Sequence, residues 1–161
     1  MSSTRSSLIR RATVNDIVAT FEVRANTREN AISRERLHQL GITPREIEVQ
    51  MMAGQLESFV AEVDGEVVGF CNGVPGTGEI HVLAVRDGFE RRGLGRGLLA
   101  AVMDVLIARG HRRLFLYTSP RSDWRAFRVY RDHGWVATGE ALPNGDERLE
   151  WLVPTAGSAV R

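Results

Sequence analysis

The sequence of 161 residues contains no lysine and a single cysteine, and each scarcity removes a class of function. Without a Gly-Lys-Ser/Thr sequence, no segment can form the P-loop of a nucleotide-binding enzyme. The single Cys71 excludes an internal disulfide and provides no zinc cluster, and the four histidines are scattered along the chain. We therefore expect no metal site.

Long apolar runs are also missing. No segment approaches the roughly 20 apolar residues of a membrane helix, and residues 1–7 lack the apolar core of a signal peptide. The formal net charge of +1 gives no overall attraction to nucleic acid or to an anionic membrane surface. These absences predict a cytoplasmic protein that binds neither nucleic acid nor membrane.

What the chain does contain is typical of a globular domain. A hydrophobic fraction of 43% and a charged fraction of 25% suit a buried core with a solvated surface. We expect a single domain over residues 1–161, with its core over about 8–153 and a loose tail at 154–161.

The most informative segment is a glycine-rich loop that connects an apolar strand to a helical pattern. Three glycines stand there at alternate positions: Gly93, Gly95 and Gly97. Three arginines accompany them: Arg91, Arg92 and Arg96. Glycines let a ligand approach the backbone, and a helix start offers unpaired N–H groups and the positive end of its dipole. The loop therefore predicts a phosphate or pyrophosphate site, the alternative being a glycine-rich turn with solvated arginines.

The spacing of the glycines discriminates between phosphate-binding motifs. A dinucleotide fold needs Gly-x-Gly-x-x-Gly after its first strand and an acid about 20 residues later. Here the loop lies past mid-chain, and the next predicted strand, 114–118, ends without an acid. The segment from Arg92 to Gly97 instead resembles the Gln/Arg-x-x-Gly-x-Gly/Ala signature of the GNAT acyltransferases. This resemblance implies that the loop binds the pyrophosphate of acetyl-CoA.

The order of predicted elements supports the same resemblance. Periodicity and turn residues predict strands at 8–11, 59–63, 67–71, 79–85, 114–118, 135–141 and 148–153, and helices at 14–21, 35–40, 44–52, 98–109 and 123–133. Asp123 or Ser122 is the expected N-cap of the last helix. Over residues 8–153 this order resembles the GNAT fold. That is an α/β fold with a central mixed sheet, helices on both faces, and central strands that splay to admit acyl-CoA.

The resemblance assigns cofactor-binding positions residue by residue. It places these backbone N–H groups against the pyrophosphate: Gly93, Leu94, Gly95, Arg96 and Gly97. Arg92 occupies the family's Gln/Arg position, while Arg91 and Arg96 either reach the 3′-phosphate or are solvated. The end of the preceding strand is expected to pair through its main chain with the pantetheine arm: Leu83, Ala84 and Val85. One N–H group of these three residues is the expected oxyanion donor.

A second motif lies in the last predicted helix. The segment from Asp123 to Trp135 resembles the family pattern Asn-x-x-Ala-x-x-x-Tyr-x-x-x-Gly-Phe, with Ala126, Tyr130 and Gly134 at matching positions. The resemblance implies that Ala126 lies against the cofactor and that the Tyr130 hydroxyl is the general acid for the departing thiol. Asp123 replaces the family's asparagine and would bring a charge close to the cofactor. The alternative for Tyr130 is a packing role in the core.

The strand before the glycine loop carries the candidate bases. Glu79 stands where amine acetyltransferases of the family have a catalytic glutamate, the alternative being an exposed glutamate at the end of a strand. His81 is the second candidate base, because histidines as a class titrate near neutral pH, and its alternative is a structural role in the sheet. In an unbroken strand Glu79, His81, Leu83 and Val85 would share one face, whereas a bulge would change part of that register. Cys71 has no partners for a nucleophilic triad and is expected in the core.

These features predict an acetyl-CoA-dependent N-acetyltransferase that passes the acetyl group directly to a primary amine. The acceptor is a small-molecule amine or a protein or peptide amine. Arg28, between the first two helices, either binds an acceptor carboxylate or is solvated. Two alternatives remain: a non-catalytic acyl-CoA-binding or regulatory module, and an enzyme that transfers a longer acyl group. The resemblance also implies a homodimer formed through an exposed sheet edge.

Overall fold

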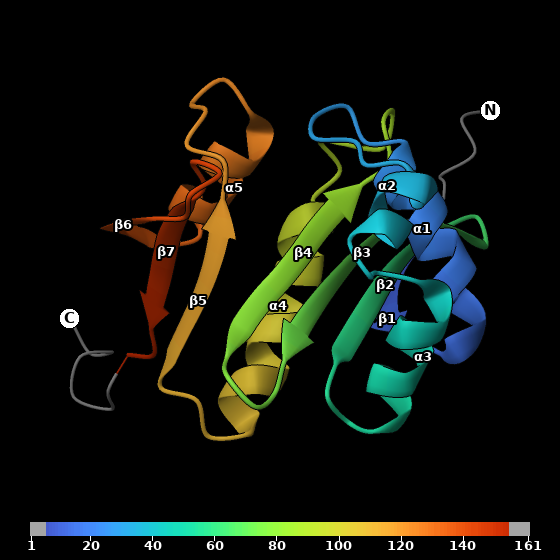
Figure 1. The fold of residues 1–161 in the computed structure, drawn as a ribbon, viewed down its shortest axis with the longest axis horizontal. Coiled ribbons are helices and arrows are strands. Elements are labelled where there is room, and N and C mark those ends of the chain that lie inside the picture. Colours follow the sequence, from blue (N-terminus) through green and yellow to red (C-terminus); the bar gives the residue numbers. More distant parts are fainter. Residues whose placement is uncertain (1–5, 155–161) are drawn as a thin grey trace.

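Seven strands form one sheet in the order β1-β2-β3-β4-β5-β7-β6 (Figure 1). The computed structural model describes residues 6–154. The strands are β1 (Ser7–Arg11), β2 (Glu57–Val63), β3 (Glu66–Val74), β4 (Glu79–Val85), β5 (Arg113–Thr118), β6 (Val136–Ala141) and β7 (Glu147–Leu152). All neighbouring strands are antiparallel except β4 and β5, which are parallel, so the sheet is mixed as predicted.

Helices cover both faces of this sheet (Figure 1). One face carries α1 (Ile17–Ala25), α2 (Arg34–Gln39) and α3 (Pro44–Met52), with a short 3-10 helix, η1 (Val14–Asp16), before α1. On the opposite face, α4 (Leu94–Ala108) and α5 (Arg125–Asp132) contribute to one hydrophobic core with side chains of the sheet. The predicted α/β architecture is therefore confirmed.

The bounds of β4 and α3 are those expected from the sequence, whereas α4 and α5 begin elsewhere. α4 begins at Leu94 rather than at residue 98, directly after Gly93. α5 begins at Arg125 rather than at 123, and its N-cap is Trp124, which makes no side-chain cap bond. The expectation that Asp123 or Ser122 caps this helix is therefore wrong. The predicted tail lies outside the described residues, apart from Pro154.

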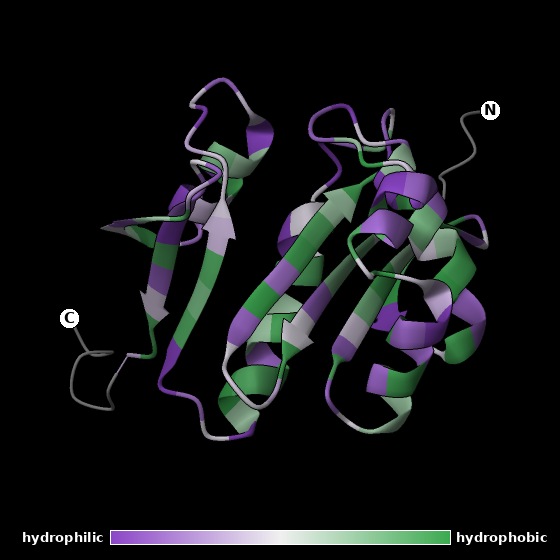
Figure 2. Ribbon diagram, in the orientation of Figure 1, coloured by the Kyte–Doolittle hydropathy of each residue, from purple (hydrophilic) through white to green (hydrophobic). Residues whose placement is uncertain are grey.

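The main core lies between the sheet and α4. Leu98, Leu99, Val102 and Leu106 are fully buried along one side of this helix, at the spacing of an amphipathic helix. Figure 2 shows the hydrophobic character of β3, β4 and α4, whereas α2 and α3 carry many hydrophilic residues. Cys71 on β3 is buried in this core, as predicted, and burial raises the pKa of its thiol. The thiol is therefore protonated and out of reach of solvent.

Strand β4 contains a bulge at His81. β3 pairs Asn72 with Val82 and then Gly73 with Ile80, so His81 has no partner on β3. An unpaired extra residue of this kind changes which side chains face each side of the sheet.

The effect of the bulge is visible in the packing on the two faces. Leu83 and Val85 pack against the core on the α4 side, whereas Ala84 packs with Val23 of α1. Glu79 precedes the bulge and faces away from the α4 side, because its neighbour Ile80 lies in that core. Of the two arrangements expected from the sequence, the structure therefore has the bulged one, in which Glu79 does not share a face with Leu83 and Val85.

None of the helices within residues 6–154 combines the length and apolar character needed to cross a bilayer. The same residues contain no group of three or more His, Cys, Asp or Glu side chains arranged to hold a metal ion. Strand β6 forms one edge of the sheet and its residues are exposed. Homodimer formation through a sheet edge and a cytoplasmic location stay predictions.

Candidate active site

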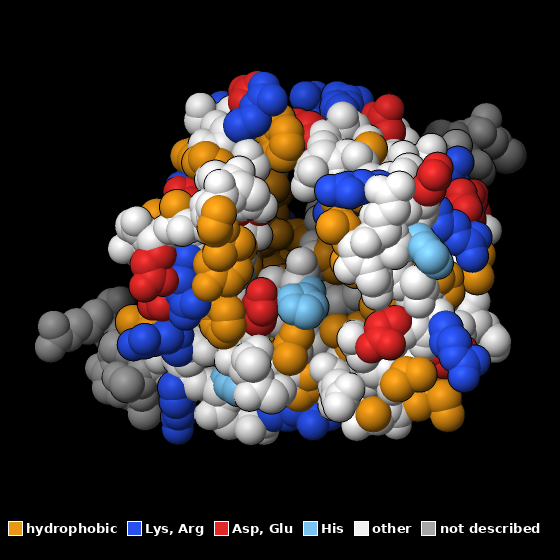
Figure 3. Space-filling model, in the orientation of Figure 1, with side chains coloured by type: hydrophobic (Ala, Val, Ile, Leu, Met, Phe, Trp, Pro, Cys, Tyr) orange, Lys and Arg blue, Asp and Glu red, His pale blue; other side chains and the backbone are white. Residues whose placement is uncertain are grey.

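The sheet opens at its centre, between β4 and β5 (Figure 1). These strands pair only through Glu79 with Phe115 and Ile80 with Leu116. A cavity of about 960 Å³ lies beside the unpaired parts, walled by β4, β5, the loop after α1 and the N-terminal ends of α4 and α5. Figure 3 shows this hollow, with hydrophobic side chains inside it and basic side chains near its rim. The volume is that of a site for a cofactor-sized ligand.

The N-terminus of α4 forms one end of the cavity. Gly93 turns the loop into the helix with a φ of 77°, a left-handed conformation that side chains rarely adopt. The N–H groups of Leu94, Gly95 and Arg96 have no hydrogen-bond partner among residues 6–154, as expected at a helix start. The N–H of Gly97 donates to the Gly93 carbonyl at 3.0 Å. Three free N–H groups and the helix dipole favour an anion at this point.

The absence of a side chain has a different structural consequence at Gly95 and at Gly97. Gly95 lines the cavity, and a Cβ there would have only Val85 Cγ2 nearby, at 3.9 Å. Gly97 is not part of the wall, and a Cβ there would lie 2.2 Å from Cδ1 of Ile9. The N–H of Gly97 is bonded within the helix and its missing side chain lets α4 approach β1, so the pyrophosphate contact of Gly97 stays a prediction that this hydrogen bond does not favour.

The three arginines of the loop also differ in position. Arg91 and Arg96 line the cavity, and Arg96 forms an exposed ion pair with Asp132 at 3.4 Å. Such a pair contributes little to stability, so Arg96 is available to a ligand phosphate. Arg92 lies outside the wall, with its guanidinium carbon 5.1 Å from the centre of the Phe89 ring. Its guanidinium stacks on this ring, and the cofactor contact of Arg92 stays a prediction.

Leu83, Ala84 and Val85 line the cavity along the edge of β4 that faces β5. Their other edge pairs with residues 69–71 of β3. Beyond Ile80, no strand within residues 6–154 pairs with the cavity-facing edge. Its backbone groups are open to an extended ligand, which is the arrangement that main-chain pairing with a pantetheine arm requires.

Tyr130 on α5 lines the cavity although only 6% of the residue is exposed. Its ring packs edge-to-face on Trp135, with 6.2 Å between the ring centres. Burial raises the pKa of the phenol, the nearby Cys71 adds to this, and the positive charge of Arg24 opposes it. The hydroxyl is therefore protonated near neutral pH and can donate to a group in the cavity.

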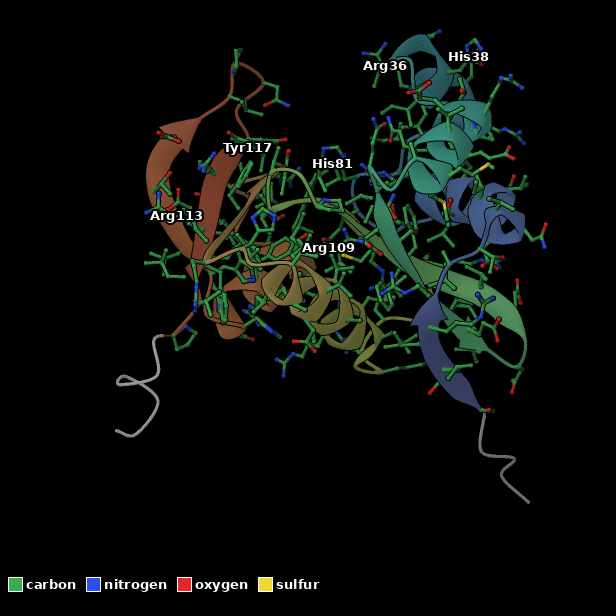
Figure 4. The ribbon with its side chains drawn as sticks, turned by 90° about the horizontal axis from the view of Figure 1, so that it is seen from below. Arg36, His38, His81, Arg109, Arg113 and Tyr117 are labelled. Carbon is green, nitrogen blue, oxygen red and sulfur yellow. The ribbon has the colours of Figure 1, made fainter. Side chains whose placement is uncertain are left out.

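Glu79 and His81 form a pair on the side of the sheet that carries α1. His81 Nε2 lies 3.3 Å from Glu79 Oε2. His81 is half-exposed and lines the cavity, whereas Glu79 lies outside the wall. Figure 4 shows His81 on β4 and Tyr117 on β5, both on the α1–α3 side of the sheet. The pairing brings the imidazole to the cavity and leaves the carboxylate in a position to orient it.

The N-terminus of α5 forms another part of the wall. Asp123 and Ala126 both line the cavity. The carboxylate of Asp123 accepts hydrogen bonds from Arg121 at 3.2 and 2.9 Å, and this pairing lowers its pKa. Glu29, from the loop after α1, accepts a hydrogen bond at 2.8 Å from the backbone N–H of Arg125. The carboxylate that stabilises the first turn of α5 therefore comes from the other side of the cavity.

Arg24 and Tyr117 are among the side chains of the wall that sequence reasoning missed. Tyr117 accepts a hydrogen bond from Arg148 at 3.0 Å, and the alternation along β5 could have indicated its face. Arg24 lies in the last turn of α1, and no local pattern distinguishes it from other arginines. Arg28, the acceptor-binding candidate from the sequence, lines the cavity and has two carboxylates beside it, Asp87 at 3.1 Å and Glu90 at 3.6 Å.

The elements around this cavity match a known family. A sequence model described as the acetyltransferase (GNAT) family matches residues 20–135, a range that contains β4, α4 and α5. The match identifies an acyltransferase enzyme. It covers well over half of the sequence, and the chain therefore belongs to the acetyltransferase (GNAT) family.

Two curated relatives resemble part of the chain. A mycothiol acetyltransferase from Acidimicrobium ferrooxidans is 36% identical over 105 residues, which are 61% of this chain and 32% of that protein. A mycothiol acetyltransferase from Beutenbergia cavernae is 46% identical over 60 residues, which are 37% of this chain and 20% of that protein. The matched part of this chain thus spans about a third or less of the length of these relatives.

Solved structures share the fold over nearly the whole chain. PaiA N-acetyltransferase from Thermoplasma acidophilum in complex with coenzyme A gives a TM-score of 0.75 at 18% identity, covering 91% of this chain and 99% of that one. Ard1 from Thermoplasma volcanium gives a TM-score of 0.70 at 23% identity, covering 92% of this chain and 99% of that one. At these identities the likeness establishes the fold alone.

Proposed function

We propose that the protein is an acetyl-CoA-dependent N-acetyltransferase that passes the acetyl group directly to a primary amine. One observation carries the proposal: free N–H groups of α4, an open edge of β4 and the hydroxyl-bearing Tyr130 border the same cavity. These features suit a pyrophosphate, an extended pantetheine arm and a departing thiol. A solved structure of the same fold in complex with coenzyme A supports this choice of cofactor.

The chemistry of the residues in the wall supports this choice of cofactor. The N–H groups of Leu94, Gly95 and Arg96 would bind the pyrophosphate, with the side chain of Arg91 as a further cation. The cavity-facing backbone of residues 83–85 would pair with the pantetheine arm, and one of its N–H groups would donate to the acetyl oxygen. When bound, acetyl-CoA supplies the activated acetyl thioester.

Two side chains of the wall would move the protons. His81 accepts a proton from the acceptor amine, while Glu79 holds the ring through Nε2. Tyr130 donates its hydroxyl proton to the departing sulfur. The two transfers balance, because the amine loses one proton and the thiol gains one. In this proposal His81 is the base and Glu79 positions it, which reverses the order of preference expected from the sequence.

The proposal is tested by acceptor-dependent release of thiol from acetyl-CoA. The chain is incubated with acetyl-CoA and a panel of primary amines, and free thiol and the mass of the product are both measured. The expected result is thiol release that needs the acceptor and yields one acetylated amine per thiol. Because both curated relatives are named for mycothiol, one part of the panel consists of amines related to that compound.

Two other results would point to the alternatives. Binding of acetyl-CoA without thiol release across the panel would favour a non-catalytic acyl-CoA-binding module. Faster release from a longer acyl-CoA than from acetyl-CoA would favour transfer of a longer acyl group.

A further inference from the structure

Arg24 and Arg28 both line the cavity, and they differ in their partners. Arg28 lies 3.1 Å from Asp87 and 3.6 Å from Glu90, so two carboxylates of the protein already stand beside it. Arg24 donates a hydrogen bond to the backbone carbonyl of Asn30 at 3.2 Å and forms no ion pair with a carboxylate of residues 6–154. Arg24 therefore brings an uncompensated positive charge to the wall.

The burial of Arg24 makes this charge costly. The residue is half-buried, and burial lowers the pKa of its guanidinium. A cation removed from water without an opposite charge destabilises the fold, and such groups in proteins are generally paired or bind a ligand. The planar guanidinium matches a carboxylate, which can accept two parallel hydrogen bonds from it. An anionic group inside the cavity would supply the missing partner.

The position of Arg24 separates this anion from the phosphates of the cofactor. The phosphates are expected at the start of α4, whereas the charge of Arg24 acts on Tyr130. Val23, beside Arg24 on α1, packs with Ala84 of β4. At a rise of about 3.3 Å per residue, His81 lies within roughly 10 Å of Ala84 along that strand. An anion bound to Arg24 would therefore lie near Tyr130 and the middle of β4, and we assign it to the acceptor.

We infer that the acceptor is a free amino acid, whose carboxylate binds Arg24 while its amine faces His81. The inference rests on the proposed function and specifies its substrate class. A carboxylate a few bonds from a primary amine satisfies both groups at once. A simple alkylamine lacks the anion, and the residue at a protein N-terminus has an uncharged peptide group in place of the carboxylate.

The experiment compares pairs of acceptors that differ only in the negative charge of the carboxylate. Each common amino acid and its carboxamide is assayed for thiol release with the wild-type chain, Arg24→Gln, Arg28→Gln and Arg36→Gln. Arg36 is the matched control, because it is exposed on α2, lies outside the cavity wall and also loses one positive charge. The folded state of each variant is checked by its melting temperature.

We expect the wild-type chain to prefer the amino acid over its carboxamide, and we expect Arg24→Gln to abolish this preference. We expect kcat/KM on the best amino acid to fall about 10- to 100-fold, the range for loss of a charged hydrogen-bonded pair. On the carboxamide kcat/KM should change less than about threefold, and Arg36→Gln should keep the preference. Equal losses on both acceptors, loss of the preference in Arg28→Gln, or weaker binding of acetyl-CoA in Arg24→Gln would overturn the inference.

A binding measurement separates this inference from the proposed activity. N-acetyl amino acids and their carboxamides are added at millimolar concentration, and the melting temperature is recorded for the wild-type chain and Arg24→Gln. A rise in melting temperature that needs both the ligand carboxylate and Arg24 supports the anion site. If no acceptor releases thiol in the first experiment, that result removes the proposed function but leaves the anion site standing. No rise in the wild-type chain, or an equal rise in both chains, overturns the anion site.

Discussion

The Glu29 carboxylate accepts a hydrogen bond from the backbone N–H of Arg125 at 2.8 Å, across 96 positions of sequence. Both residues line the cavity, so the bond joins the loop after α1 to the first turn of α5. It fixes the helix that carries Tyr130 relative to the part of the chain that carries Arg24. The acidic cap also suits the positive end of the helix dipole.

Removal of this cap should loosen the start of α5. Glu29→Ala is expected to cost about 1 kcal/mol of unfolding free energy, the usual value for loss of a cap, and to speed hydrogen exchange at the Arg125 amide. Glu29→Gln keeps an acceptor oxygen and should lie between Glu29→Ala and the wild-type chain. The measurement is denaturant unfolding combined with site-resolved hydrogen exchange. Unchanged exchange at Arg125 in Glu29→Ala would show that the bond does not hold the helix.

Tyr130→Phe tests the proposed acid. The change removes only the hydroxyl, so the ring should keep its packing on Trp135. We expect kcat to fall about 10²- to 10⁴-fold, the range for loss of a general acid, while the affinity for acetyl-CoA changes less than about threefold. Steady-state kinetics and a binding titration measure the two effects separately. If kcat were unchanged, Tyr130 would be a packing residue and not the acid.

His81→Asn and Glu79→Gln distinguish the base from the residue that positions it. We expect kcat/KM to fall about 10²- to 10³-fold in His81→Asn and less in Glu79→Gln, because Glu79 lies outside the wall. In Glu79→Gln the imidazole nitrogen signals should also show a changed tautomer balance, since Nε2 loses its carboxylate partner. Glu48→Gln, which removes an exposed carboxylate on α3, is the control. A larger loss in Glu79→Gln than in His81→Asn would make Glu79 the base.

Asp16 predicts an acid-dependent part of the stability. Its carboxylate accepts hydrogen bonds from Arg10 at 2.8 and 2.9 Å, and this pairing lowers its pKa below the ordinary value. The ionised carboxylate of Asp16 therefore adds its full share to the free energy of unfolding above the unfolded-state pKa of about 4. This share is lost as the pH falls through the lower folded-state pKa. Asp16→Asn should cost about 1–3 kcal/mol at pH 7, and the difference should shrink below about pH 4.

Urea unfolding of the two chains from pH 7 down to the lowest pH at which both fold measures this difference. Asp104→Asn, at an exposed position of α4, should change stability by less than about 0.5 kcal/mol at any pH. A difference between Asp16→Asn and the wild-type chain that stayed constant with pH would contradict the role of the ionised carboxylate.

Features set by local sequence could be predicted. The helix α3 begins at Pro44 and ends before Gly54, and both signals lie within the segment itself. The glycine-rich loop and the Tyr130 motif also depend on spacing within short segments, and both come to border the cavity. The order of strands and helices could be predicted from such local patterns along the chain.

Features set by contacts between distant segments could not be predicted. The sequence left open whether the strand before the glycine loop is bulged, because the bulge at His81 depends on how β3 pairs with β4. The different roles of Gly95 and Gly97 depend on where β1 lies. Arg24 and Arg28 are both arginines near the end of α1, and only the carboxylates that fold back onto Arg28 distinguish them.

Calorimetric titration with acetyl-CoA tests the central claim, which is that the start of α4 holds the cofactor in this cavity. The wild-type chain should bind one acetyl-CoA, and Gly95→Ala should bind it at least about tenfold more weakly, because a side chain at this position would hinder the approach of the pyrophosphate to the free N–H groups. The melting temperature of Gly95→Ala should not fall, since its Cβ meets no atom closer than 3.9 Å. Gly76→Ala, in open space outside the cavity wall, should bind as the wild-type chain does. No binding at millimolar acetyl-CoA, or equal affinity in Gly95→Ala, would contradict the account.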